Sequence, residues 1–303
     1  MEIIINHKVK ITRAAEEMMR RIENYKHPII NNYQLFLIFK ELYKNPKGLY
    51  LRRDSSKIEA FRSTCRILRK TTKTLTEDRD YPSFYRIVSI SDLPADEIVC
   101  IADPYCYISH LSAMQRYNLT DRRPKALHIT RPTQETAKNL IKLRVKEDNN
   151  LNTASENTTE HIPLFNTHHP NSVRGRDISC LETKHWGKHI KIKGTESRIS
   201  TIGQTFLDMI EYPILCGGML HVIDVWKEHA EIYLDEIIET ISTAPKKIHK
   251  VRAGYILDEI IKINRPEIDE WAQNVQRGGS RLLDPSKPYK NNFSEKWMIS
   301  INV

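Results

Sequence analysis

The chain has 303 residues, of which 40% are hydrophobic and 28% charged, the composition of a folded globular protein rather than a disordered one. Its formal net charge is +9 and its isoelectric point about 9.2, a balance that suits a polyanionic partner without specifying one. No apolar run approaches the roughly 18 residues needed to cross a bilayer, and residues 1–10 lack the features of a secretory signal. We therefore expect a cytoplasmic protein of two domains.

The five cysteines are scattered along the chain, and no two of them form a CxxC pair. They are Cys65, Cys100, Cys106, Cys180 and Cys216. This usage indicates reduced, mostly buried thiols in a cytosolic protein.

The first 92 residues predict a helix-rich domain that ends in a hairpin. Residues 12–25 form an amphipathic pattern, and residues 32–45 predict a second helix with Asn32 as its N-cap. The sequence NPKG stops that helix, and residues 55–75 predict a third one. Residues 75–90 then read as a β-hairpin that turns between Asp78 and Pro82.

The third predicted helix carries two stripes of side chains at helical spacing. The apolar stripe contains Ile58, Phe61, Cys65, Leu68 and Leu75, and the basic stripe contains Arg62, Arg66, Arg69 and Lys73. Residues 52–73 hold eight basic and two acidic residues, a net charge of +6. Like charges four apart destabilise a helix unless a partner such as a phosphate backbone neutralises them. A solvated basic face without a ligand, or an RNA-binding face, is the alternative.

The order helix, turn, basic helix, hairpin predicts a winged helix-turn-helix within residues 1–92, in which the basic helix enters the DNA major groove. Arginine and lysine side chains near that helix and on the hairpin are the candidate DNA-binding residues. They are Arg52, Arg53, Lys57, Arg62, Arg66, Arg69, Lys70, Lys73, Arg79 and Arg86.

Residues 93–303 predict a larger mixed α/β domain, which makes the expected fold class α+β. We expect strands at 97–103, 125–130, 189–194, 197–201 and 295–303, and helices at 104–117, 133–148 and, in several pieces, 204–264. The helical stretch is broken at YPILCGG and TAPKK. Residues 148–174 are polar, rich in Asn and Thr, and predict a long exposed loop or insertion.

Histidines in two places invite a metal interpretation, which the spacing does not favour. His161, His168 and His169 fall in the polar insertion, and His185 and His189 flank a glycine just before a strand. Neither group has the convergent cysteine or carboxylate partners of a zinc site. We expect surface histidines, no metal and no cofactor.

The sequence gives no strong sign of a catalytic site, and we expect the protein not to be an enzyme. The sequence contains no GxxxxGK[ST], GxSxG or HExxH motif. Cys106 and His110 would share one face of a helix, but a buried thiol beside a surface histidine explains them better than a nucleophile pair. The acidic residues of the C-terminal helices read as solvated faces. They are Asp208, Glu211, Asp224, Glu228 and Glu231.

Three longer stretches carry a resemblance to a known family. YISHLSAMQRYNLTDRRPKALHIT at 107–130, RISTIGQTFLDMIEYPILCGGMLHVIDVWKEH at 198–229 and RGGSRLLDPSKPYKNNFSEKWMISINV at 277–303 resemble, in the same order, segments of the AbiEi-type antitoxins. These are bacterial transcriptional regulators of viral-defence systems. Within the resemblance, Thr205, Leu207 and Asp208 read as a helix start with its core contact, and Gly217 and Gly218 as a turn.

The resemblance implies an N-terminal winged helix-turn-helix followed by an α/β domain. It implies a repressor that binds double-stranded DNA at inverted repeats in the promoter of its own operon. A homodimer on that DNA is one open possibility. It also implies an antitoxin of a type IV toxin–antitoxin (abortive infection) system, which counteracts a co-encoded nucleotidyltransferase-like toxin without a stable complex. The family offers no catalytic residues to carry over.

Two other functions stay open at this point. The C-terminal domain could be an effector enzyme or an RNA-binding module of a phage-defence system, which the N-terminal domain delivers. The amphipathic helices within 217–264 could instead make the protein a scaffold for another defence protein. A converging pocket of titratable residues would favour the enzyme, and a large exposed apolar patch would favour the scaffold.

Overall fold

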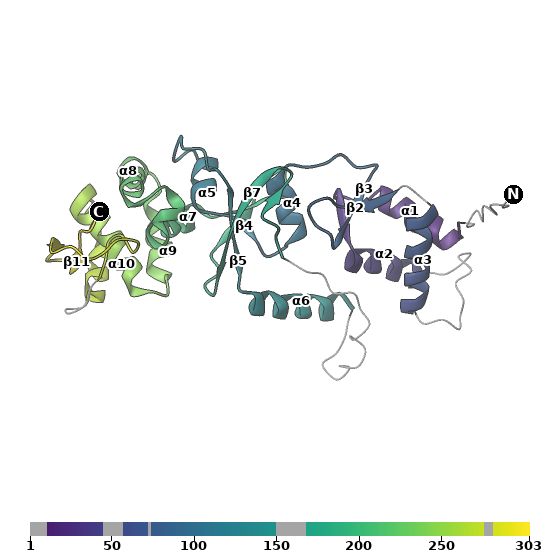
Figure 1. Ribbon diagram of the computed structural model, residues 1–303. Helices are drawn as coiled ribbons and strands as arrows, with labels where there is room; N and C mark the ends of the chain where they lie inside the picture. Colours follow the sequence, from purple (N-terminus) through teal and green to yellow (C-terminus); the bar gives the residue numbers. More distant parts are fainter. Residues whose placement is uncertain (1–10, 45–56, 72–73, 150–167, 276–280) are drawn as a thin grey trace. The chain divides into compact units, whose positions relative to one another are not determined.

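A computed structural model describes residues 11–44, 57–71, 74–149, 168–275 and 281–303, and it confirms a mixed α/β protein (Figure 1). The chain divides into two compact units. Unit 1 contains Met1–Pro104 and Gln134–Gly175, and unit 2 contains Tyr105–Thr133 and Arg176–Val303. The expected boundary lay between residues 92 and 93, whereas unit 1 also takes in residues 93–104 and a later segment of the chain.

The first part of unit 1 follows the predicted order of elements, with one strand added. The elements are α1 (Arg13–Glu23), β1 (Ile29–Asn31), α2 (Asn32–Lys44), α3 (Lys57–Thr71), β2 (Leu75–Glu77) and β3 (Phe84–Ile87). The three helices and the hairpin are confirmed. The strand β1 was not predicted, and it pairs with β3 to make an antiparallel sheet in the order β1-β3-β2.

Local hydrogen bonds explain where α1 and α2 begin. The Thr12 hydroxyl accepts a hydrogen bond from the Ala15 N–H at 3.2 Å. Asn31 and Gln34 form a reciprocal pair, in which each side chain accepts the other's backbone N–H at 2.8 and 2.9 Å. The cap of α2 is therefore Asn31, one residue before the Asn32 that the sequence suggested.

The core of this part of unit 1 is built around Phe61 of α3. Its ring centroid lies 5.5 Å from that of Phe36 and 5.7 Å from that of Phe39, both on α2. Met18 of α1 and Ile87 of β3 are buried in the same cluster. The apolar stripe of α3 thus supplies the contact surface for both neighbouring helices and the sheet.

The remainder of unit 1 contains α4 (Ala95–Ala102), α6 (Gln134–Asn149) and the short strand β6 (Ser172–Val173). The prediction of a strand at 97–103 was wrong, because this segment is the helix α4. Pro94 precedes it, and Asp96 and Glu97 stand in its first turn, where carboxylates interact favourably with the helix dipole. Helix α6 is confirmed within one residue of its predicted bounds.

Unit 2 contains a sheet in which β7, β5, β4, β9 and β8 lie side by side in that order. Their bounds are β4 (Tyr107–Ile108), β5 (Leu127–Pro132), β7 (Arg176–Thr183), β8 (His189–Lys191) and β9 (Arg198–Ser200). Strands β5 and β7 are parallel, as are β4 and β9, while β4 with β5 and β8 with β9 are antiparallel. The strands β5, β8 and β9 were predicted, whereas β7 was missed.

The prediction of a helix from Pro104 was wrong in its first half. The chain forms β4 there, and α5 (His110–Arg116) begins only after it. Cys106 and His110 therefore do not share a helix face. Among the cysteines, four are buried as expected, but Cys180 on β7 is exposed.

The C-terminal part of unit 2 is helical, as predicted, and is broken at the expected places. Its elements are α7 (Ile202–Glu211), η2 (Pro213–Cys216), α8 (Met219–His229), α9 (Leu234–Thr243), α10 (Lys247–Gly254), the π-helix η3 (Tyr255–Ile261), α11 (Pro266–Trp271) and η4 (Ala272–Asn274). Pro213 opens η2, and Gly217 and Gly218 adopt φ of +90° and +93° before α8. None of the helices within the described residues has the length and apolarity that a membrane span requires.

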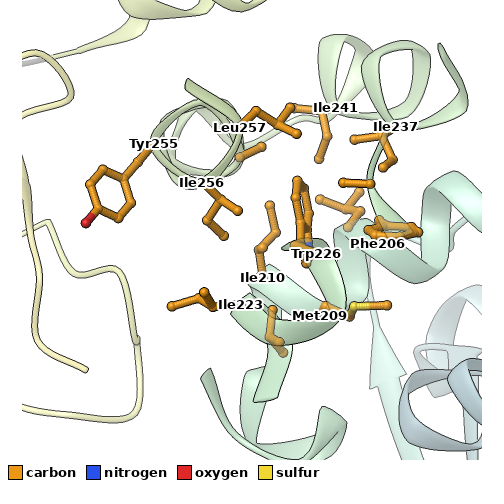
Figure 2. Packing of buried hydrophobic residues seen from close by; sticks show 14 of the residues in the cluster. Phe206, Met209, Ile210, Ile223, Trp226, Ile237, Ile241, Tyr255, Ile256 and Leu257 are labelled. Carbon is orange, nitrogen blue, oxygen red and sulfur yellow. The ribbon is translucent and has the colours of Figure 1, made fainter. Parts of the chain in front are cut away.

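Figure 2 shows the core of these helices, in which Phe206, Ile210 and Ile256 surround the buried indole of Trp226. The expected final strand at 295–303 is shortened to β11 (Ile299–Ser300), which pairs with β10 (Phe293–Ser294). Trp297 in the turn between these strands is fully buried and donates its indole N–H to Asp258 at 2.9 Å.

Gly254 at the end of α10 is packed so closely that no side chain fits. A Cβ at this position would stand 2.1 Å from the ring of Trp297. We predict that Gly254→Ala lowers the free energy of unfolding by about 1–3 kcal/mol, although alanine favours a helix more than glycine does. Urea denaturation measures this change, and Lys247→Ala on the exposed side of the same helix should stay within about 0.5 kcal/mol.

A double-mutant cycle tests whether the indole of Trp297 causes the loss of stability in Gly254→Ala. In a Trp297→Phe background, which removes the ring atoms nearest to Gly254, the cost of Gly254→Ala should become smaller. An equal cost in both backgrounds would show that the contact with Trp297 is not what excludes the methyl group.

Candidate functional site

The helix α3 has a buried apolar face and, beside it, an exposed basic face, as its sequence predicted. Phe61, Cys65 and Leu68 are buried in the core of unit 1. The residues that we call the basic face are all exposed: Arg62, Arg66, Arg69 and Lys70. The separation of apolar from basic side chains on α3 is therefore confirmed, and the structure brings these four cations together on one side of one helix.

Within the basic face, the four side chains differ in direction. At 100° per residue, Arg66 and Lys70 point most directly away from the buried Phe61. Arg69 lies toward the hairpin, where its guanidinium donates to the Tyr85 hydroxyl at 3.2 Å and lies 5.8 Å from the centroid of that ring. This contact fixes Arg69 against β3, while Arg66 and Lys70 extend into solvent.

The other predicted DNA-binding residues differ in whether the structure describes them and in how exposed they are. Arg52, Arg53 and Lys73 lie outside the described residues. Lys57 at the start of α3 is exposed, with its ammonium 5.5 Å from the centroid of the Tyr43 ring. Arg79 is exposed in the β2–β3 turn, 3.7 Å from the carboxylate of Asp80.

Arg86 takes a different position from the rest. Its side chain is half-buried and donates to the carbonyl oxygens of Pro28, Ile87 and Ile90. Three backbone acceptors hold the guanidinium within unit 1, so this arginine ties the hairpin to the segment before β1. It contributes to the fold and is not grouped with the basic face.

Arg174, which the sequence gave no reason to select, holds the turn of the hairpin. Its guanidinium donates to Asp78 at 2.7 Å, to Asp80 and, at 3.2 Å, to Asp92. The Arg174 side chain is 6% exposed and that of Asp78 is 1% exposed. Burial opposes ionisation of Asp78, but hydrogen bonds from Arg174 and from the backbone N–H groups of Tyr81 and Asp80 outweigh it and lower the pKa of the carboxyl.

A second buried contact from the same region reaches the hairpin through a histidine. The Tyr81 hydroxyl and His169 Nδ1 lie 2.8 Å apart, and His169 Nε2 lies 3.3 Å from the Asp103 carboxylate. The prediction of a surface histidine was wrong for His169, which is buried, whereas His168 and His185 are exposed. No sequence spacing signals this contact, because Tyr81 and His169 are 88 residues apart.

Unit 2 contains a buried polar centre where β4, β5 and α7 meet. Thr130 donates to the Ser109 hydroxyl at 2.8 Å, and Ser109 lies 2.7 Å from Nδ1 of His110. His110 has φ of +51°, and its backbone N–H donates to the carboxyl group of Asp208. The side-chain amide of Gln204 donates to the same carboxyl group at 2.7 Å.

Burial dominates the protonation states in this centre. It raises the pKa of Asp208 to about 8, assisted by the charge of Glu211, so this carboxyl is protonated at neutral pH. It lowers the pKa of His110 to about 3, so the imidazole is neutral. The expectation of a solvated Asp208 was wrong. A serine, a histidine and a carboxyl group are thus close together, but each is buried and they serve to position α5 on α7.

Glu211, one turn along α7 from Asp208, is also mostly buried. Its carboxylate lies 2.5 Å from Lys246 and 3.7 Å from His249. Burial lowers the pKa of His249 to about 4, so the ion pair of Glu211 is with Lys246. The carboxylates of α7 therefore form packed contacts, and the sequence-based interpretation of solvated faces fails for this helix.

Replacing Arg174 tests the contact that holds the hairpin turn. We predict that Arg174→Gln lowers the free energy of unfolding by about 3 kcal/mol at pH 7, since it leaves the buried carboxylate of Asp78 without its cation. The folded-state pKa of Asp78 is depressed, so its contribution is present above about pH 4 and is lost as pH falls through the folded-state value. The difference between the two proteins should therefore shrink in acid.

Urea unfolding at pH 7 and near pH 3 measures that difference. Arg176→Gln, an exposed arginine two residues later, is the control and should change the free energy of unfolding by less than about 0.5 kcal/mol. Equal effects of the two substitutions would contradict a special role for Arg174.

Asp208 should produce the opposite pH dependence. Because its folded-state pKa is raised, the carboxyl lowers stability as pH rises from about 4 to about 8. We predict that Asp208→Asn, which keeps an acceptor for Gln204, gains stability relative to the wild type by about 1.4 kcal/mol per pH unit in this window. Chemical denaturation between pH 5 and 8 measures the difference, and a constant difference would mean that Asp208 ionises normally in the fold.

Comparisons with known proteins show a likeness in structure alone. No family model and no curated protein matches the chain. The crystal structure of the RV2827C protein from Mycobacterium tuberculosis is similar over 96% of this chain and 92% of that chain, with 11% sequence identity and a TM-score of 0.45. A likeness of this size identifies neither a family nor a function, and inference about function therefore rests on the residues of this chain.

Proposed function

We propose that unit 1 is a winged helix-turn-helix that binds double-stranded DNA through the basic face of α3. The observation that carries this proposal is the division of α3 into a buried apolar stripe and an exposed basic one. The order of α2, α3 and the β2–β3 hairpin supports it, because a basic second helix followed by a hairpin is typical of such domains.

The positive charges of α3 repel one another, and a negatively charged partner outside the helix would stabilise them. Arg62, Arg66 and Lys70 are spaced four apart, so each neighbouring pair of cations repels by a few tenths of a kcal/mol. The buried stripe holds them on the surface of unit 1, so the helix cannot rotate them apart. Phosphates along a DNA groove would relieve this repulsion and release counterions on binding.

We assign roles to the described residues by their direction. Arg66 and Lys70 face away from the core and would reach furthest into the major groove, with Arg62 beside them. Arg69 is held by Tyr85 and would contact the backbone, as would Lys57 at the start of α3. Arg79 would act from the hairpin turn, and Arg86 is left out because backbone carbonyls occupy its guanidinium.

We further propose that the protein is an autorepressor and an antitoxin of a type IV system. The support for this step is the resemblance of residues 107–130, 198–229 and 277–303 to the AbiEi-type family. The DNA partner would be inverted repeats in the promoter of its own operon, bound by a homodimer. The functional partner would be a nucleotidyltransferase-like toxin, counteracted in the cytoplasm without a stable complex.

Fluorescence anisotropy with the duplex upstream of the gene tests the DNA-binding step. A complex about 10³ times tighter than that with a scrambled duplex would support an operator-binding regulator. A slope of several units in a plot of log K against log salt concentration would assign much of the affinity to phosphate contacts. Weak and equal binding to both duplexes would contradict the proposal.

The basic face can be tested by charge reversal. We predict that Arg62→Glu combined with Arg66→Glu weakens binding to the specific duplex about 100-fold or more, because two attractive groups become repulsive. Both side chains are exposed, so the melting temperature should change little. The same anisotropy assay and a thermal melt measure the two quantities.

Helix α6 provides a matched control in the same unit. Lys138 and Lys142 are also exposed and four residues apart, so Lys138→Glu with Lys142→Glu makes the same change in net charge on another helix. Binding should stay within about threefold of the wild type. If both double variants lose affinity equally, the DNA responds to net charge and not to the face of α3.

A further inference from the structure

Residues 184–193 of unit 2, with the sequence KHWGKHIKIK, form a second basic surface that the proposed function does not use. The segment contains four lysines and no acidic residue. It connects β7 to β8 and includes β8, which lies at the edge of the sheet among the described strands. Lys184, Lys188, Lys191 and Lys193 are all exposed.

Aromatic rings lie between these lysines and continue into the sheet. The ring of His189 is stacked on that of Tyr107, with centroids 4.9 Å apart and planes within 6°. Trp186 lies 4.7 Å from His189 on the outer side, and Tyr105 makes an edge contact with Trp186 at 6.3 Å. Tyr107 is buried and Trp186 is 36% exposed, so the row runs from the core of unit 2 to its surface.

The turn that presents Trp186 is held by contacts on both sides of Gly187. The Gly187 N–H donates to the Tyr107 hydroxyl at 3.1 Å, and the Lys188 carbonyl accepts from the Thr201 N–H at 3.0 Å. A Cβ at Gly187 would stand 2.5 Å from the side chain of Gln204, which is itself hydrogen-bonded to Asp208. The indole is therefore displayed on a positioned turn.

The charges of the segment are available to a polyanion. Lys188 pairs with Glu239 at 2.7 Å and Lys191 with Glu196 at 2.8 Å, but three of these four side chains are more than half exposed. Exposed ion pairs of this kind contribute little and can be exchanged for contacts with phosphate. Burial lowers the pKa of His189, so its ring stacks as a neutral surface.

We propose that residues 184–193 bind single-stranded nucleic acid, with a base stacked on Trp186 and the phosphates of the strand held by the lysines. Proteins that bind single strands combine these two elements, a basic track and aromatic rings on which bases stack. The site lies in unit 2 and takes unpaired strands, so it is independent of duplex binding by α3. Lys191 on β8, with Lys188 and Lys193 on either side of the strand, also disfavours the addition of a strand from a protein partner at this edge.

The tryptophans of the chain give a direct probe of this site. All four lie within the described residues, and Trp226, Trp271 and Trp297 are at most 3% exposed. Adding (rU)n or (dT)n oligomers of about 12 nucleotides to the full chain should quench the exposed indole fluorescence as a base stacks on it. Anisotropy of the same oligomers, labelled with fluorescein, gives the affinity.

Trp186→Ala should weaken binding of the single-stranded oligomers about tenfold or more and abolish the quenching, while Trp186→Phe should stay within about threefold of the wild type. The α3 variant Arg62→Glu with Arg66→Glu should retain this binding. Lys184→Ala with Lys193→Ala should reduce the salt dependence of binding by about one unit.

Two results would overturn the proposal. One is the absence of quenching and of binding by wild-type protein at about 0.1 M salt, which would leave the segment as a solvated surface or a protein contact. The other is unchanged affinity in Trp186→Ala together with its loss in the α3 variant, which would place single strands on α3. Neither result decides whether α3 binds duplex DNA, because that question is answered by a different ligand, in the comparison of the upstream duplex with the scrambled one.

Discussion

The burial of Phe61 is the constraint on which unit 1 depends. Its ring packs against Phe36 and Phe39 of α2, and this contact sets the rotation of α3 about its own axis. Once that rotation is set, helical periodicity leaves Arg66 and Lys70 no position except the surface. The concentration of positive charge on α3 thus follows from the packing of one apolar stripe, and neither stripe can move without the other.

Buried polar side chains fix segments that are distant in the sequence to one another, as the apolar contacts of Phe61 fix α3. Arg174 neutralises Asp78 in the hairpin turn from 96 residues away, and the turn between β6 and β7 is thereby tied to the sheet of unit 1. In unit 2 the protonated Asp208 accepts from Gln204, whose side chain in turn packs on Gly187 beside Trp186. The same physical rule operates in both units, since a buried charged or polar side chain is tolerated only where its partners are in place.

Sequence analysis succeeded where the interacting residues are close together in the sequence and failed where they are far apart. The helix α3 was predictable because apolar and basic periodicities lie within 15 residues, and the β2–β3 hairpin because its turn residues are local. The segment of α4 was mistaken for a strand because a short apolar run fits either structure. The contacts of Arg174 and Asp208 were missed because no local pattern encodes a partner from another element. The basic face was therefore predictable, while its support and the row of rings at Trp186 were not.

The structure shows where some of the residues behind the net charge of +9 lie. A uniformly basic surface would attract any polyanion, whereas here cations gather on the exposed face of α3 in unit 1 and beside stacked rings in unit 2. A helix face without exposed rings fits a groove, in which bases are paired and their flat sides are covered. A tryptophan on a positioned turn fits a base whose flat side is open. The two surfaces thus differ in what they offer beyond charge, and on that difference we base the proposal of a duplex for one and a single strand for the other.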